Sequence, residues 1–183
     1  MEYDYAMSGA AKGRRVREVP VPPGSLAAGA FAVTSYADAY SIDLPPGHAH
    51  DVDSLTRLMA TSSPRWAEPL MWLRNRIASL VGLRTERSSR RPSTGRLEPG
   101  ETAGMFRVYA RSDDEILLGG DDRHLDFRGS MLITPGGASA VLTTVVHFNN
   151  RLGYVYFFVV RPFHRLIVTS LLHNMARHLE GEK

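Results

Sequence analysis

The residues of this sequence best suited to acid–base chemistry are Asp126 and His147, accompanied by His124 and Arg128. A histidine titrates near neutral pH, and a carboxylate that holds its ring in one tautomer allows it to act as a general base. These four residues are therefore the catalytic candidates of an enzyme hypothesis. The sequence contains no G-x-S-x-G, H-E-x-x-H or P-loop pattern that would name a reaction.

Metal chemistry is suggested only by His48 and His50, which are followed by Asp51 and Asp53. Two histidines one residue apart, without a third ligand at helical spacing, do not define a metal site. The simpler interpretation is that Asp51 or Asp53 caps the next helix and interacts with its positive N-terminal end. We predict no metal site and no cofactor, and there is no G-x-G-x-x-G pattern for a dinucleotide.

Four consecutive strands would have to position the candidate residues. Apolar and polar residues alternate in 105–111, 115–121, 125–134 and 140–149, with turn-forming residues between these segments. The predicted structure is an antiparallel meander, whose register follows from centring each turn. The expected pairs are Phe127 with Val146, Met131 with Leu142, Ile133 with Ala140, Leu125 with Phe148, Leu118 with Phe127, Val108 with Leu118, Ala110 with Ile116, Arg111 with Glu115 and Asp126 with His147.

This register collects the apolar side chains on one face of the predicted sheet. Asp126, Arg128 and His147 fall on the other, mixed face, which we interpret as solvated. That placement argues against the enzyme hypothesis, because a catalytic pair needs a concave site rather than open solvent.

Further elements precede and follow the meander. We predict a strand at 37–44, a helix at 52–61, a second helix from Ser63 to Gly82, and a helix of about 28 residues after Asn149 or Asn150. Pro162 should bend this last helix. Its predicted core-facing stripe is Leu152, Val155, Tyr156, Val159, Phe163, Leu166, Ile167, Ser170, Leu171 and Met175.

Large apolar residues also lie off that stripe, among them Phe157, Phe158 and Val160. A helix that is apolar nearly all round is buried on more than one side. We therefore expect the second helix, through Trp66, Leu70 and Leu73, or a second copy of the chain, to cover the remainder. A homodimer through the C-terminal helix is thus one of the expected partners.

Composition indicates a soluble globular protein, with 183 residues, 43% apolar content, 22% charged content and a net charge of +3. We expect residues 1–29 to be a mobile tail and residues 30–180 a single domain with an exposed Arg-rich loop at about 84–100. That loop lacks interleaved aromatic residues, so no nucleic-acid partner is predicted.

The absence of cysteine and of an apolar signal segment is consistent with a cytoplasmic location. The most apolar run, residues 152–172, is interrupted by Arg161, Pro162, His164 and Arg165. Arginine near a bilayer centre costs roughly 2.5–3.5 kcal/mol, so no transmembrane segment is predicted.

The predicted fold class is α+β: a curved antiparallel sheet wrapped round a long C-terminal helix, with two helices after the first strand. This order resembles the helix-grip fold of START-like, birch-pollen-allergen-like domains. A more specific resemblance is carried by the stretches 36–40 with 44–47, 64–66, 115–119, 121–128 (DDRHLDFR), 142–147 and 161–165 (RPFHR). Through these stretches the chain is similar, over about residues 30–175, to a bacterial family, domain-of-unknown-function family 2867.

The resemblance implies a cavity between the sheet and the last helix, which suggests binding of a small apolar or amphipathic molecule. The expected lining residues are Phe106, Val108, Phe127, Met131, Leu142 and Val146 of the sheet, and Trp66, Tyr156, Phe163 and Ile167 of the helices. Two alternatives stay open: a small enzyme that uses the Asp/His/Arg cluster, and a protein-interaction domain in which the same side chains pack a filled core.

Overall fold

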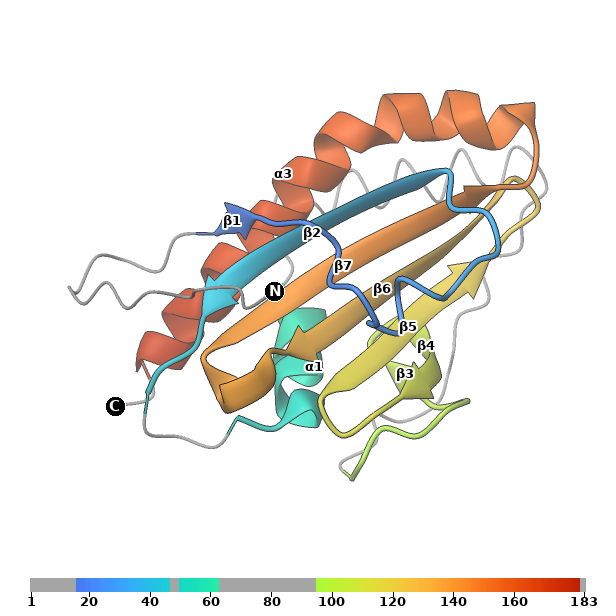
Figure 1. Ribbon diagram of the computed structural model, residues 1–183. Coiled ribbons are helices and arrows are strands. Elements are labelled where there is room, and N and C mark those ends of the chain that lie inside the picture. Colours follow the sequence, from blue (N-terminus) through green and yellow to red (C-terminus); the bar gives the residue numbers. More distant parts are fainter. Residues whose placement is uncertain (1–15, 47–49, 63–94, 182–183) are drawn as a thin grey trace.

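The computed structural model describes residues 16–46, 50–62 and 95–181 (Figure 1). Its centre is an open, seven-stranded antiparallel sheet with the strand order β1-β2-β7-β6-β5-β4-β3. Together with helices α1 and α3 of the described residues, this sheet confirms the predicted α+β class. The elements are β1 (Arg17–Glu18), β2 (Tyr36–Asp43), α1 (Val52–Thr61), β3 (Thr102–Ala103), β4 (Phe106–Arg111), β5 (Glu115–Asp121), β6 (Leu125–Ile133), β7 (Ser139–Phe148) and α3 (Arg151–Gly181).

Helices α1 and α3 contribute to one hydrophobic core with the same face of the sheet, which we call the inner face. Leu55 of α1, Leu172 of α3 and Met131 of β6 are each at most 2% exposed in that core. The short helix α1 begins at the predicted cap, since the Asp51 carboxylate accepts a hydrogen bond from the Ser54 amide at 3.0 Å. The second predicted helix, at 63–82, lies outside the described residues.

The β6–β7 register is confirmed, with Phe127 opposite Val146 and Asp126 opposite His147. The β5–β6 register is wrong by two residues, because Leu118 lies opposite Gly129 and not opposite Phe127. The turn centre lies one residue later than expected, at 123–124, where the Asp122 amide donates to the Asp126 carboxylate. A shift of two residues leaves each side chain on the same face of the sheet, so the apolar residues still lie on the inner face as predicted.

A β-bulge at Tyr109 changes the end of β4. Val108 is paired with Leu118 as predicted, but the register shifts before Ala110. An extra residue in one strand reverses the faces of all residues after it. Ala110 therefore packs on the outer face, while Arg111 lies opposite Ile116 and turns inward. The predicted pairs of Ala110 with Ile116 and of Arg111 with Glu115 are wrong for this reason.

The face opposite the two helices, which we call the outer face, is not open to solvent throughout. Residues 19–35 cross it in front of β7, β6 and β5 (Figure 1), and Ala27 is 0% exposed there against Leu117 and Val145. The Leu26 amide donates to the Glu115 carboxylate at 2.7 Å. Residues 17–18 and 26–27, which the sequence placed in a mobile tail, therefore have partners in the structure, since β1 pairs with β2 and Leu26 and Ala27 contact the outer face. Residues 1–15 lie outside the described residues.

The long helix α3 contains 31 residues, and Asn150 caps it as predicted by accepting from the Leu152 amide at 3.0 Å. Pro162 lies inside this helix, which curves along the edge of the sheet (Figure 1). The predicted core stripe is wrong for the N-terminal half of α3. Phe157 is buried there, whereas Val155 and Val159 of the predicted stripe are 60% and 59% exposed.

Candidate functional site

Two motifs that are more than 120 residues apart in the chain meet where β2 runs beside α3. Alternation along β2 directs Tyr36, Asp38 and Tyr40 to the inner face, and the middle of α3 approaches them there. We call this group the β2–α3 cluster. It consists of Tyr36, Asp38 and Tyr40 of β2, together with Arg161, His164 and Arg165 of α3.

Asp38 is the centre of the β2–α3 cluster, and its side chain is only 4% exposed. The Tyr36 hydroxyl donates to the Asp38 carboxylate at 2.7 Å. The His164 Nε2 atom lies 3.2 Å from the same oxygen, and the His164 side chain is 18% exposed. A buried carboxylate is costly unless it is paired and hydrogen-bonded, so Tyr36 and His164 are what allow Asp38 to occupy this position.

Aromatic and cationic groups surround this polar contact. The Phe157 ring lies 4.6 Å from the Tyr36 ring, measured between centroids. The Arg161 guanidinium lies 5.3 Å from the centroid of the Tyr36 ring, within the range of a cation–π interaction. Arg161 has no carboxylate partner among the described residues.

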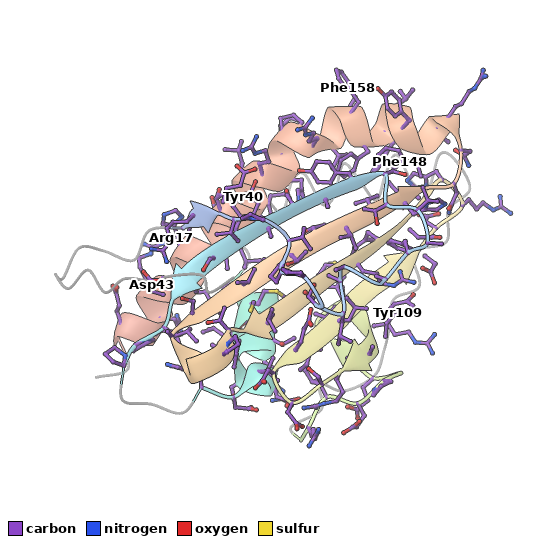
Figure 2. The ribbon with its side chains drawn as sticks, viewed as in Figure 1. Arg17, Tyr40, Asp43, Tyr109, Phe148 and Phe158 are labelled. Atoms are coloured by element: carbon purple, nitrogen blue, oxygen red, sulfur yellow. The ribbon has the colours of Figure 1, made fainter. Side chains whose placement is uncertain are left out.

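Arg165 closes the outer edge of the cluster. Its Nε donates to the Tyr40 hydroxyl at 3.2 Å, and its Nη2 lies 2.6 Å from the Glu18 carboxylate (Figure 2 labels Tyr40). These contacts join β1, β2 and α3. Arg165 therefore has a hydrogen-bond partner in β2 and a carboxylate partner in β1, whereas Arg161 has no carboxylate partner among the described residues.

Burial raises the pKa of Tyr36, and the hydrogen bond to Asp38 and its negative charge act in the same direction. Burial, followed by the charge of Asp38, also raises the pKa of Tyr40. Both phenols therefore remain neutral at any physiological pH, and Tyr36 stays a hydrogen-bond donor to Asp38.

This raised pKa predicts a specific alkaline sensitivity. A group whose pKa is higher in the folded state gives stability that is complete below its unfolded pKa, here 10.0, and is lost as the pH rises further. We therefore compare the fall in melting temperature between pH ~8 and a pH above 10.0 in the two proteins. We expect this fall to be smaller in Tyr36→Phe than in the wild type. Tyr154→Phe, at a 63% exposed position, serves as the control and should follow the wild type.

The inner face next to Asp38 is only partly covered. Asp38 pairs with Thr144, and Thr144 pairs with Gly129, so these three residues form one row across the sheet. Thr144, Gly129 and the adjacent Phe127 are only half-buried, although they belong to β7 and β6 in the middle of the sheet. One row away, Met131 is 0% exposed. This part of the sheet is therefore more accessible than the core beside it.

The predicted lining residues fall into different environments. Val108, Met131, Leu142 and Val146 are at most 6% exposed and belong to the packed core. Phe106, Phe127, Tyr156 and Ile167 are half-buried, and the Phe106 and Phe127 rings meet edge to face at 5.7 Å. Phe163 is 43% exposed, and Trp66 lies outside the described residues. Among the described residues, the half-buried group and Phe163 are accessible to a bound molecule, whereas the four core residues are not.

The predicted dyad of Asp126 and His147 is not formed. The two residues are opposite each other in the β6–β7 register, but each side chain has a different partner. The Asp126 carboxylate accepts from the Asp122 amide at 3.0 Å, and His147 Nδ1 lies 2.7 Å from the Val33 carbonyl oxygen. Asp126 therefore shapes the β5–β6 turn, and His147 holds the segment that precedes β2.

The other two catalytic candidates are also held by structural contacts. The Arg128 guanidinium lies 3.6 Å from the Tyr109 ring centroid and 2.7 Å from the Asp121 carboxylate. The His124 ring packs edge to face on Tyr156 at 4.8 Å. The structure does not bring the four candidates together as one site.

Among the residues that the structure describes, no group of three histidines, cysteines or carboxylates lies close enough to hold a metal ion. Asp53, from the metal-like stretch, is instead paired with Arg111. His48 lies outside the described residues.

Sequence reasoning placed no function on Asp38 and His164, although a signal was present. Asp38 has the same parity as Tyr40 and Ile42, so it is a charged residue on the apolar side of a predicted strand. Such a residue needs a buried partner. The sequence could not identify His164 as that partner, because the two residues are 126 positions apart.

The fold and the cluster define an α+β domain with a buried carboxylate between its sheet and its C-terminal helix. The chain belongs to the family described as "Protein of unknown function (DUF2867)", whose model matches residues 30–171. That range includes both halves of the β2–α3 cluster. No curated protein and no solved structure matches the chain.

Proposed function

We propose that this protein binds a small amphipathic molecule between the inner face of its sheet and the N-terminal half of α3, in the manner of a START-like helix-grip domain. The observation that carries the proposal is the buried Asp38 carboxylate, held by Tyr36 and His164 at the edge of a partly covered region of the sheet. Binding sites of this kind combine an apolar wall with a few polar groups that fix orientation.

The polar end of the ligand would be acidic. Arg161 supplies a positive charge without a carboxylate partner among the described residues, and it lies over Tyr36. His164 engages Asp38 through Nε2, which leaves its other ring nitrogen for a ligand. The apolar body would lie over Phe127, Gly129 and Thr144, where the sheet is half-buried.

Native mass spectrometry of the purified protein tests the proposal, together with titration with 8-anilinonaphthalene-1-sulfonate. This fluorescent anion has an apolar body and one acidic group, as the proposed ligand has. We expect Arg161→Gln to weaken its binding by about tenfold, the effect of losing roughly 1.4 kcal/mol from a charge-assisted contact. Arg177→Gln, an exposed position on the same helix, is the matched control.

A second pair of variants tests the anchor itself. His164→Gln should weaken binding of the dye and remove any co-purified adduct, because it removes the ring nitrogen that would face the acidic group. Asp38→Asn should have the same effect, because the His164 ring loses the carboxylate that orients it. Asp43→Asn, on the same strand but the outer face, and His173→Gln, exposed on the same helix, should not. A protein that binds no dye and carries no adduct would have a filled core, which would overturn the proposal and favour the protein-interaction alternative.

A second candidate function, acid–base catalysis, is favoured by the contact between Asp38 and His164. A carboxylate that orients an imidazole is the usual arrangement of a general base. If an adduct is found, its conversion over time in the wild type and in His164→Gln distinguishes the two functions. A ligand that stays chemically unchanged in both proteins supports binding alone.

A further inference from the structure

The N-terminal half of α3 carries a second apolar surface, directed away from the sheet. We call it the outward face. It consists of Leu152, Val155, Phe158, Val159 and Leu166, which are 49%, 60%, 73%, 59% and 56% exposed. Figure 2 shows Phe158 on the side of α3 that points away from the strands. Contiguous exposed apolar residues of this kind mark interaction surfaces.

By length and apolar composition alone, α3 could cross a membrane, and little of its most apolar part is buried in the structure. The side of α3 opposite the outward face nevertheless packs against the sheet. A Cβ atom on Gly153 would lie 1.9 Å from the His124 carbonyl oxygen, and His164 contacts Asp38. Only one side of the helix can therefore meet lipid, as in a helix that lies in the plane of a membrane surface.

The charged residues of α3 indicate which kind of surface the outward face would bind. The helix contains four arginines, and its first acidic residue is Glu180, at the far end. Arg151 is exposed beside the outward face. An anionic surface would complement these charges, whereas a second copy of the same helix would bring like charges together.

We propose that the outward face docks the protein on an anionic phospholipid bilayer. The axis of the N-terminal half of α3 would lie parallel to the membrane, with Val155, Phe158 and Val159 in the acyl boundary and Arg151 at the phosphates. This inference stands independently of the proposed ligand site, because it rests on the opposite side of the helix.

Co-sedimentation of the full chain with vesicles tests the inference. We expect binding to phosphatidylcholine vesicles that contain phosphatidylglycerol, weaker binding to phosphatidylcholine alone, and loss of binding at high salt. The double variant Val155→Ser/Phe158→Ser should reduce vesicle binding at least about tenfold, because the apolar area that enters the membrane is lost.

The matched control is Val33→Ser/Met105→Ser, which removes two apolar side chains that are 65% and 59% exposed elsewhere on the protein. This control should bind vesicles as the wild type does. No binding by the wild type, or an equal loss in the control, would overturn the inference.

Two further measurements on the outward-face variant, without lipid, exclude other occupants. A lower melting temperature would show that another part of the chain covers the outward face. A halved mass in gel filtration would show that a second copy covers it. Either result would overturn docking on a membrane, whereas an unchanged mass and melting temperature together with lost vesicle binding would support it.

Discussion

Replacing Gly153 with alanine is expected to lower the free energy of unfolding by about 3 kcal/mol or more, which is a fall of roughly 6–12 °C in melting temperature. The added Cβ would lie 1.9 Å from the His124 carbonyl oxygen and 2.9 Å from its carbonyl carbon. Both are backbone atoms, so no change of rotamer relieves the overlap. The first turn of α3 would have to move away from the β5–β6 turn.

That movement would also break hydrogen bonds that dock the helix. The side-chain amides of Asn149 and Asn150 donate to the carbonyl oxygens of Asp122 and Arg123, each at 2.8 Å. Gly181→Ala, at the other end of α3, is the control, because its Cβ would meet nothing within 4 Å. Equal melting temperatures for the two variants would show that α3 is not seated on this turn.

The second large effect is expected at the ion pair of Asp53 and Arg111. The Asp53 and Arg111 side chains are each 8% exposed, and the guanidinium contacts both carboxylate oxygens at 3.2 Å. Arg111 also donates to the Leu97 carbonyl oxygen at 3.0 Å. We expect Arg111→Met to destabilise the protein by about 3–5 kcal/mol, because it leaves a buried carboxylate without its cation. Urea denaturation measures this change.

Two control variants distinguish the effect of burial on stability from the effect of losing a charge. Arg17→Met breaks an exposed pair, since Arg17 and Asp43 have side chains that are 51% and 46% exposed at the edge of β1 and β2 (Figure 2). It should cost no more than about 1 kcal/mol. The double variant Asp53→Leu/Arg111→Met should recover most of the loss, because no unpaired charge remains buried. A double variant as unstable as Arg111→Met would contradict this account.

Much of the sheet could be predicted because its signals are local. Alternation of apolar residues predicted five strands, and the β6–β7 turn predicted the pairing of Phe127 with Val146. The caps at Asp51 and Asn150 also depend only on neighbouring residues. Even the two-residue error in the β5–β6 register left the faces correct, since side chains alternate with a period of two.

The bulge at Tyr109 and the cover on the outer face required the tertiary structure. A bulge depends on the fit between two strands, and nothing in residues 106–111 alone states that Arg111 turns inward toward Asp53. Residues 19–29 combine three prolines and two glycines with mostly small side chains and show no strand or helix periodicity, so the sequence predicted them to be part of a tail. Only the sheet beneath them shows that Ala27 and the Leu26 amide have partners there.

The orientation of α3 shows the limit of periodicity most clearly. Its N-terminal half is apolar on nearly every side, so the hydrophobic pattern cannot distinguish the buried face from the exposed one. The choice is made by contacts with distant residues: Gly153 allows close approach to His124, and His164 meets the buried Asp38. The sequence by itself therefore determined that α3 is a helix with two apolar sides. Steric fit and the cost of burying an unpaired carboxylate, which exist only in the folded chain, decided which side faces the sheet.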